Sequence, residues 1–305
     1  MKRSFVFVLL LFVAITSANA FELNSAGPIW EVGNGPVTVT LNSTGSEDLT
    51  LYETESGVNN AIKTWQKVSG NIQLQYEGTS SGAQFHGSDE MNSVLWIEKN
   101  WEYSSSTLAI TKYTYVIGEP SYMLDVDILF NGVDWEWITN QKLNHDKVDF
   151  EQVLLHELGH LLGLSHTAVY KASMYPYLPE KVKHTLNRDD KNGLRFLYDS
   201  PSPDFILVTP VRNATYPDEI VNMGLPLPVF RWYGGGNTSF ALEFSDASDF
   251  KKKISFSAGS NTYYTLNSSE LKTVLSLAQS KKVFWRVASG TNSTKPQTLK
   301  FKSIS

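Results

Sequence analysis

HELGHLLGLSH, residues 156–166, is the segment that decides the fold of the region around it. On an α-helix, His156 and His160 are one turn apart and present their imidazoles on the same side. Gly163 is expected to end the helix, because glycine adopts the left-handed conformation without penalty. His166 follows directly after this turn. We therefore expect the three imidazoles to converge.

The residue types in this segment suit a catalytic zinc. Three neutral nitrogen donors leave the fourth tetrahedral position open for water. Zinc lowers the pKa of such a water from about 15.7 toward about 7, and Glu157 would take its proton as general base. A single histidine in an apolar helix is more often a packed core residue. The fixed spacing of three histidines, a glutamate and a glycine favours the zinc site and predicts hydrolysis of a peptide bond or another amide.

Flanking residues set the limits of this helix. Asp149 can accept a hydrogen bond from the first turn, and Gln152 completes a capping-box pattern. The helix is expected to present an apolar stripe made of Leu154, Leu155, Leu158, Leu161 and Leu162. A further helix is expected over 188–198, with Leu194 and Leu197 on its inner side.

The rest of the first 199 residues has a mixed pattern. A helix is predicted over 57–68, and strands are predicted over 36–41, 72–76, 93–97, 108–117 and 123–130. A helix, several strands and two more helices indicate a mixed α+β domain with a twisted sheet and three helices. We assign it to residues 21–199.

Beyond residue 199 the character of the sequence changes. Residues 200–204 have the composition of a linker. Short strands are then expected over 229–232, 239–244, 254–256, 263–266, 283–287 and 298–301. Such strands at regular spacing predict an all-β sandwich over residues 205–305.

Bulk properties exclude several classes of protein. A chain of 305 residues suggests about two domains. The net charge of −5 gives no indication of nucleic-acid binding, and the absence of cysteine excludes disulfides and thiolate metal sites. We expect a monomer.

The first twenty residues read as a secretory signal peptide. Lys2 and Arg3 precede an apolar run over 5–15, and Ala18-Asn19-Ala20 forms a small-x-small cleavage signature. The run is shorter than the roughly 20 residues that cross a bilayer, and no later stretch is long and apolar enough. We therefore expect a mature chain that begins at Phe21, has no transmembrane segment, and is secreted or periplasmic.

The segment 156–166, followed by Ser173-Met174-Tyr175-Pro176, resembles the metzincin metallopeptidases and specifically the matrixins, the matrix-metalloproteinase-like family. The compact bacterial members are the most similar in pattern. The resemblance implies a secreted zinc metalloendopeptidase acting on proteins or peptides, with Met174 beneath the three imidazoles and the extracellular matrix as the setting associated with the family. Residues 186–198 are similar to the C-terminal matrixin helix. Residues 108–111 (LAIT) resemble the strand that borders the substrate cleft, where a peptide would add to the strand edge.

Some features depart from the family. No cysteine is present to hold the zinc inactive. The histidines of a second, structural zinc have no counterparts, and His86, His145 and His184 are expected on the surface. Calcium is a further hypothesis, because hard oxygen donors gather near a strand end. We prefer to interpret these donors as solvated loop residues; they are Asp125, Asp127, Asn131 and Asp134.

The C-terminal region resembles a fibronectin type III-like or related immunoglobulin-like module. The resemblance rests on Phe-Arg-Trp at 230–232, Phe-Ala-Leu-Glu-Phe at 240–244 and Phe-Trp-Arg-Val at 284–287. Such a module could bind a polymer or protein ligand, but the fold alone names none. The alternative function is a secreted binding or adhesion protein whose metal site is vestigial or acts on a non-peptide amide. Retention of Glu157 counts against a vestigial site.

Overall fold

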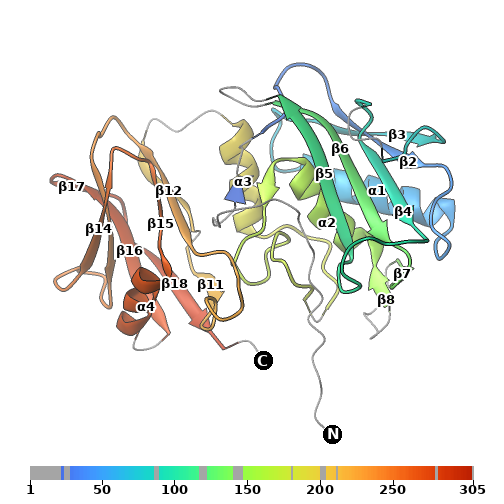
Figure 1. Cartoon of the computed structure of the whole chain (residues 1–305). Coiled ribbons are helices and arrows are strands. Elements are labelled where there is room, and N and C mark those ends of the chain that lie inside the picture. Colours follow the sequence, from blue (N-terminus) through green and yellow to red (C-terminus); the bar gives the residue numbers. More distant parts are fainter. Residues whose placement is uncertain are drawn as a thin grey trace, which may run out of the picture. The chain divides into compact units, whose positions relative to one another are not determined.

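A computed structural model describes residues 22–23, 28–85, 89–116, 122–139, 147–179, 181–199, 204–210, 212–278 and 281–303. The predicted signal peptide, His86 and His145 lie outside these residues. The chain divides into two compact units: Leu23–Leu164 with Pro176–Leu186, and Ser165–Tyr175 with Asn187–Ser305 (Figure 1). No helix in the described ranges is long and apolar enough to cross a membrane.

The first unit is built on a five-stranded sheet in the order β3-β2-β4-β6-β5. All neighbours are parallel except β5 and β6, so β5 is an antiparallel edge strand. The strands are β2 (Val37–Asn42), β3 (Leu74–Ser80), β4 (Ser93–Ile97), β5 (Ala109–Val116) and β6 (Tyr122–Asn131). Two short pairs complete the set: β7 (Glu136–Ile138) with β8 (Lys147–Asp149), and β1 (Glu22–Leu23) with β9 (Leu164–Ser165).

Helix α1 (Leu51–Gln66) packs against helix α2 (Phe150–Leu161), as Figure 1 shows. Gly57 allows the close approach, because a Cβ atom there would lie 2.8 Å from Cδ1 of Phe150. The buried Trp65 donates its indole N–H to the carbonyl of Leu155 at 2.9 Å. Our predicted start of α1 was wrong. Thr50 caps the helix in a capping box with Glu53, so the helix begins six residues earlier than the apolar pattern suggested.

Helix α2 is buried along its whole length, which the predicted leucine stripe understated. Asp149 is its N-cap, as predicted, and accepts from the Gln152 N–H at 2.8 Å. The second half of the predicted capping box is absent from the described contacts, because the Gln152 side-chain oxygen accepts from the Lys183 N–H instead. The helix ends where Gly163 has φ of 90°, which confirms the predicted stop.

We had expected His184 to lie on the surface, but it is partly buried and contacts two carboxylates. Its Nε2 lies 2.6 Å from Oδ1 of Asp149, and its Nδ1 lies 3.3 Å from Oε1 of Glu151. Its side chain is only 21% exposed. The hydrogen bond to Asp149 raises the pKa of His184, against the opposing effect of burial. The two carboxylates at the start of α2 therefore favour the protonated form of His184, and in that form the histidine forms ion pairs with the first turn of the helix.

In its described residues the second unit has two sheets and the helices α3 and α4. One sheet has the order β10-β12-β15, and the other has the order β11-β18-β16-β13-β14, with β17 paired to β16. The centre of the buried Phe230 ring in β12 lies 5.1 Å from the ring centre of Phe244 in β13 and 4.7 Å from that of Trp285 in β16. Because β12 belongs to one sheet and β13 and β16 to the other, the two sheets pack face to face. The elements are α3 (Arg188–Tyr198), β10 (Phe205–Thr209), β11 (Ala214–Pro217), β12 (Val229–Gly234), β13 (Phe240–Ser245), β14 (Ile254–Gly259), β15 (Tyr263–Thr265), α4 (Ser268–Leu277), β16 (Lys282–Ser289), β17 (Asn292–Ser293) and β18 (Gln297–Lys302).

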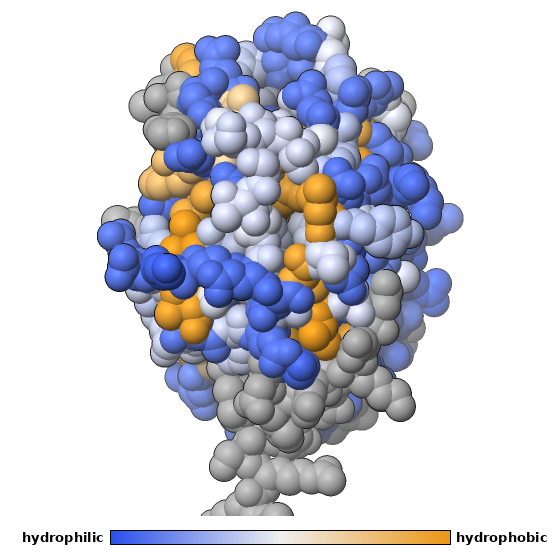
Figure 2. Space-filling view, turned by 90° about the vertical axis from the view of Figure 1, so that its right-hand side faces the viewer, coloured by the Kyte–Doolittle hydropathy of each residue, from blue (hydrophilic) through white to orange (hydrophobic). Residues whose placement is uncertain are grey.

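The surface has an ordinary mixture of residues on the face seen in Figure 2. Hydrophobic residues lie there in separate groups between hydrophilic ones. The described chain has a few large apolar side chains exposed, among them Leu51, Tyr52, Phe85 and Ile206. The core lies instead between the first unit's sheet and its helices, and between the two sheets of the second unit.

Substituting Gly57 with alanine should destabilise the protein, although alanine is the better helix former by about 1 kcal/mol. The new methyl group would press on the ring of Phe150, and overpacking of this kind costs about 1–3 kcal/mol. Because the gain and the cost oppose each other, urea unfolding should show a net loss of roughly 0–2 kcal/mol for Gly57→Ala. Lys63→Ala, at an exposed position of the same helix, should change stability by less than about 0.5 kcal/mol. A Gly57→Ala protein that is more stable than wild type by the full helix-propensity gain of about 1 kcal/mol would contradict the close helix contact.

Replacing His184 should destabilise the protein in a pH-dependent way. A folded-state pKa above the ordinary value of about 6.5 means that the stabilisation is complete below that value and is lost as the pH rises through the raised pKa. The difference in unfolding free energy between wild type and His184→Asn should be on the order of 1 kcal/mol near pH 6 and smaller near pH 9. An equal difference at both pH values would show that the ion pair is not its source.

Candidate metal centre

The three predicted histidines come together. One ring nitrogen from each of His156, His160 and His166 lies within 4.8 Å of the others. His156 and His160 are buried, and their Nε2 atoms are 3.0 Å apart. Two nitrogens bound to one tetrahedral zinc at about 2.05 Å would be about 3.3 Å apart, so the donors fit that ion with a small adjustment. Within the described ranges no other such group of ligands is found.

The second ligand is oriented by the backbone. Nδ1 of His160 lies 2.7 Å from the carbonyl oxygen of Leu164. A carbonyl can only accept, so Nδ1 carries the proton and Nε2 is the nitrogen that can present a lone pair to a metal. Burial lowers the pKa of His160 to about 4, against the opposing effect of that hydrogen bond. The imidazole is therefore neutral at physiological pH, which is the form that binds zinc.

Glu157 lies on α2 beside the first ligand and is 2% exposed. Its Oε2 accepts a hydrogen bond of 2.6 Å from the hydroxyl of Thr111 on the edge strand β5. Burial raises the pKa of Glu157 to about 8, and the Thr111 bond opposes the rise. A carboxyl group with such a pKa can both accept and return a proton near neutral pH. The structure thus adds Thr111 to the site, which the sequence had marked only as part of a cleft-bordering strand.

Met174 is fully buried, and its backbone is held on both sides. Its N–H donates to Oδ1 of Asp190 at 3.0 Å, and its carbonyl accepts from the N–H of Thr167 at 2.9 Å. These bonds close a loop between the third histidine and the methionine. The place of the Met174 side chain beneath the imidazoles stays a prediction.

The four oxygen donors considered for calcium separate into two pairs. Asp125 and Asp127 are buried on β6, each 1% exposed, so our interpretation of them as solvated loop residues was wrong. Asn131 is the last residue of β6 and Asp134 lies in the turn after it; the Asn131 amide donates to Oδ2 of Asp134 at 3.0 Å. Asn131 is also buried, and its amide donates to the carbonyl of Thr107 as well.

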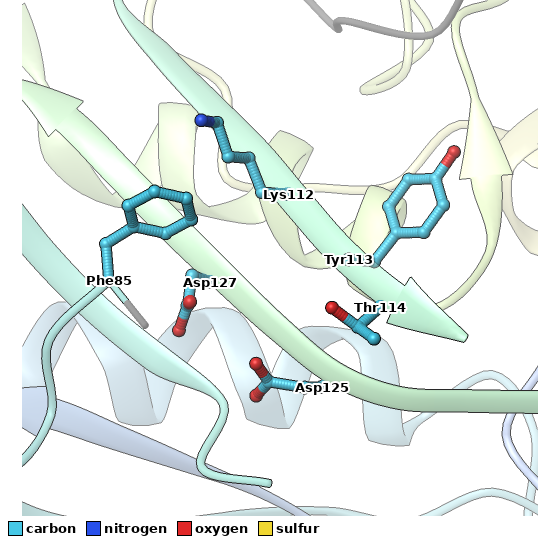
Figure 3. A pocket seen from close by; sticks show the side chains of 6 residues that line it. All are labelled: Phe85, Lys112, Tyr113, Thr114, Asp125 and Asp127. Carbon is cyan, nitrogen blue, oxygen red and sulfur yellow. The ribbon is translucent and has the colours of Figure 1, made fainter. Parts of the chain in front are cut away.

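Asp125 and Asp127 line a pocket of about 150 Å³ with Phe85, Lys112, Tyr113 and Thr114 (Figure 3). Burial, followed by the charge of Asp89, raises the pKa of Asp125. Oδ1 of Asp125 has no hydrogen-bond partner among the described residues. Lys112 also lines the pocket, and its ammonium lies 4.2 Å from the centre of the Phe85 ring, so a positive charge is present among the lining residues. This lysine weakens the case for a divalent cation.

Comparison with known proteins shows a consistent relationship. The chain is 49% identical over 69 residues to Metalloendoproteinase 4-MMP of Arabidopsis thaliana, covering 22% of this chain and 20% of that protein. It is 40% identical over 67 residues to Stromelysin-3 of Xenopus laevis, covering 22% and 14%. It is 31% identical over 179 residues to Matrix metalloproteinase-B of Caenorhabditis elegans, covering 53% and 34%. The matched part is thus about a third or less of each of these relatives.

A family model for matrixins matches residues 30–199. This range contains the three histidines, Glu157, Met174 and helix α3. Because it extends over more than half of the sequence and surrounds the metal centre just described, the chain belongs to the matrixin family.

Proposed function

We propose that this chain is an exported zinc-dependent metalloendopeptidase that cleaves proteins or peptides. The observation that carries the proposal is the convergence of His156, His160 and His166, with the buried Glu157 next to the first of them. Membership of the matrixin family supports the same activity. Export rests on the signal peptide pattern in residues 1–20.

In this mechanism zinc, held by the three imidazoles, would polarise the scissile carbonyl and acidify a water molecule. Glu157 would take the proton of that water and return it to the leaving amine. Thr111 would hold the Glu157 carboxylate in place by its 2.6 Å bond. The carbonyl of Leu164 would keep His160 in the tautomer that offers Nε2. A nearby metal charge favours the ionised form of Glu157, against the effect of burial.

The substrate would bind in extended form along β5. This strand pairs with β6 on one side and is an edge strand of the described sheet on the other. An edge strand can add a peptide strand through backbone hydrogen bonds. Thr111 lies on β5, so such a peptide would pass beside Glu157.

For the remaining organisation we keep residues 21–199 as the peptidase domain, 200–204 as the linker and 205–305 as a fibronectin type III-like sandwich in a monomer. The two sheets that pack face to face support the assignment of a sandwich to residues 205–305. The alternative, a binding or adhesion protein with an inactive metal site, is disfavoured by the hydrogen-bonded Glu157. Calcium stays a hypothesis for Asp125 and Asp127 alone, since Asn131 and Asp134 bond to each other.

Glu157→Ala should abolish cleavage without removing the metal. Loss of the proton acceptor should reduce casein cleavage by about 10²–10⁴-fold, while metal analysis should find about one zinc per chain in both proteins. Glu151→Ala is the matched control, because Glu151 is a buried glutamate on the same helix that faces His184 rather than the histidine cluster. A fully active Glu157→Ala protein would exclude its role as base. A wild-type protein that binds zinc but cuts no substrate would favour the binding-protein alternative.

Thr111→Val should lower kcat by about tenfold and leave KM nearly unchanged, because the hydroxyl orients the base rather than the substrate. Thr111→Ser keeps the donor and should restore most of the rate. Zinc content should be equal in all three proteins. A kcat for Thr111→Val that equals the wild-type value would show that Glu157 does not need this bond.

A further inference from the structure

The carboxylate of Asp189 connects two parts of the second unit. Asp189 is in the first turn of α3 and is fully buried. Its Oδ2 accepts a hydrogen bond of 3.0 Å from the hydroxyl of Thr167, the residue after His166. Its Oδ1 accepts a hydrogen bond of 3.3 Å from the hydroxyl of Thr209, the last residue of β10. One carboxylate therefore joins the segment of the third histidine to a strand of the sheet.

The surroundings of this carboxylate make both bonds important. Thr167 and Thr209 are each fully buried, so water does not compete for Asp189 at these hydroxyls. Hydrogen bonds to an ionised group are roughly twice as strong as those between neutral groups, and a buried charge without partners is costly. Tyr216 of β11 is also fully buried, and the Asp189 charge contributes, after burial itself, to a raised pKa of its phenol. The Asp189 carboxylate thus has buried hydroxyl donors both from β10 and from the segment after His166.

The same segment is held at further points. The N–H of Tyr170 donates to the carbonyl of Thr215 in β11 at 2.8 Å. The N–H groups of Ser173 and Met174 donate to the two oxygens of Asp190 at 2.9 and 3.0 Å. The Asn192 amide of α3 donates to the carbonyl of Val208 in β10 at 3.0 Å. Residues 165–175 are therefore fixed by α3 and by β11, while α3 is fixed in turn by β10.

We propose that Thr209 is a positioning residue for the metal centre, through which β10 holds Asp189 and hence Thr167 and His166 in place. The proposal rests on the zinc site of the proposed function. His160 and His156 are fixed by α2, whereas His166 lies beyond the helix and depends on the segment 165–175. In this view the C-terminal sheets contribute to zinc affinity, in addition to any ligand that they bind.

The test measures zinc affinity of the full chain by competition with a chromophoric chelator. Changes to residues that orient metal ligands cost 10–100-fold in affinity, and Thr209 acts through one further bond. Thr209→Val and Thr209→Ala should therefore weaken zinc binding by about 3- to 10-fold. Thr209→Ser keeps the hydroxyl and should bind zinc within about twofold of wild type.

Thr298→Val is the matched control. Thr298 is another buried threonine of the sheets, and its hydroxyl donates to Oδ1 of Asn213 at 2.6 Å rather than to Asp189. This variant and the Thr209 variants should all lower the melting temperature of the EDTA-treated protein. Thr298→Val, however, should leave the zinc affinity unchanged.

The outcomes separate the two proposals. Wild-type zinc affinity in both Thr209→Val and Thr209→Ala overturns the positioning role, and so does an equal loss of affinity in Thr298→Val, which would indicate general loosening. A wild-type chain that binds no zinc instead overturns the proposed function. Two variants that remove the hydroxyl, one larger and one smaller than threonine, keep the test decisive if one of them fails to fold.

Discussion

The position of helix α2 is the constraint on which the metal centre depends. Two candidate zinc ligands and the candidate base lie on this one helix, so a rotation about its axis would displace His156, Glu157 and His160 together. The helix is fixed at its start by Asp149 and His184, and the Trp30 indole N–H donates to the Leu161 carbonyl near its end. Along its side, Gly57 brings α1 into contact with Phe150. Packing thus sets the rotation before any metal binds.

Burial of a helix with polar groups requires partners for each group, because an unsatisfied buried donor or acceptor costs about 1–3 kcal/mol. The partners come from several elements: Thr111 of β5 for Glu157, Asn60 of α1 and His184 for Glu151, and the Leu164 carbonyl for His160. The leucines between these residues are almost fully buried and limit access of water. The polar groups of the centre are therefore part of the core of the first unit, which explains how a neutral His160 and a high-pKa Glu157 arise in the same helix.

The sequence was sufficient for features that depend on local spacing. The convergence of His156, His160 and His166 and the stop at Gly163 follow from helix geometry and one glycine. Partners far apart in the chain could not be found in this way, since the Thr111 and Glu157 bond and the His184 ion pair arise only when strands and helices pack. Two helix starts were marked in the sequence but not predicted: Thr50 with Glu53, and Asn267 with Glu270, form the capping boxes of α1 and of α4, a helix that the predicted all-β sandwich did not contain. The burial of Asp125 and Asp127 could not be predicted, because a carboxylate within a strand carries no local signal that it is buried.

The residues that match the matrixin family and the residues that pack around the metal centre do not end at the same point in the chain. The matrixin match ends at residue 199, but the buried carboxylate of Asp189 accepts a hydrogen bond from Thr209, which lies beyond it. Sequence similarity follows the residues that perform chemistry and their immediate supports. Sequence similarity does not reveal a supporting contact from a later strand, because that strand need not exist in every relative. If β10 positions the third histidine as we propose, the peptidase domain is a unit of sequence rather than a unit of folding, and the sheets that follow it are part of the metal centre's scaffold.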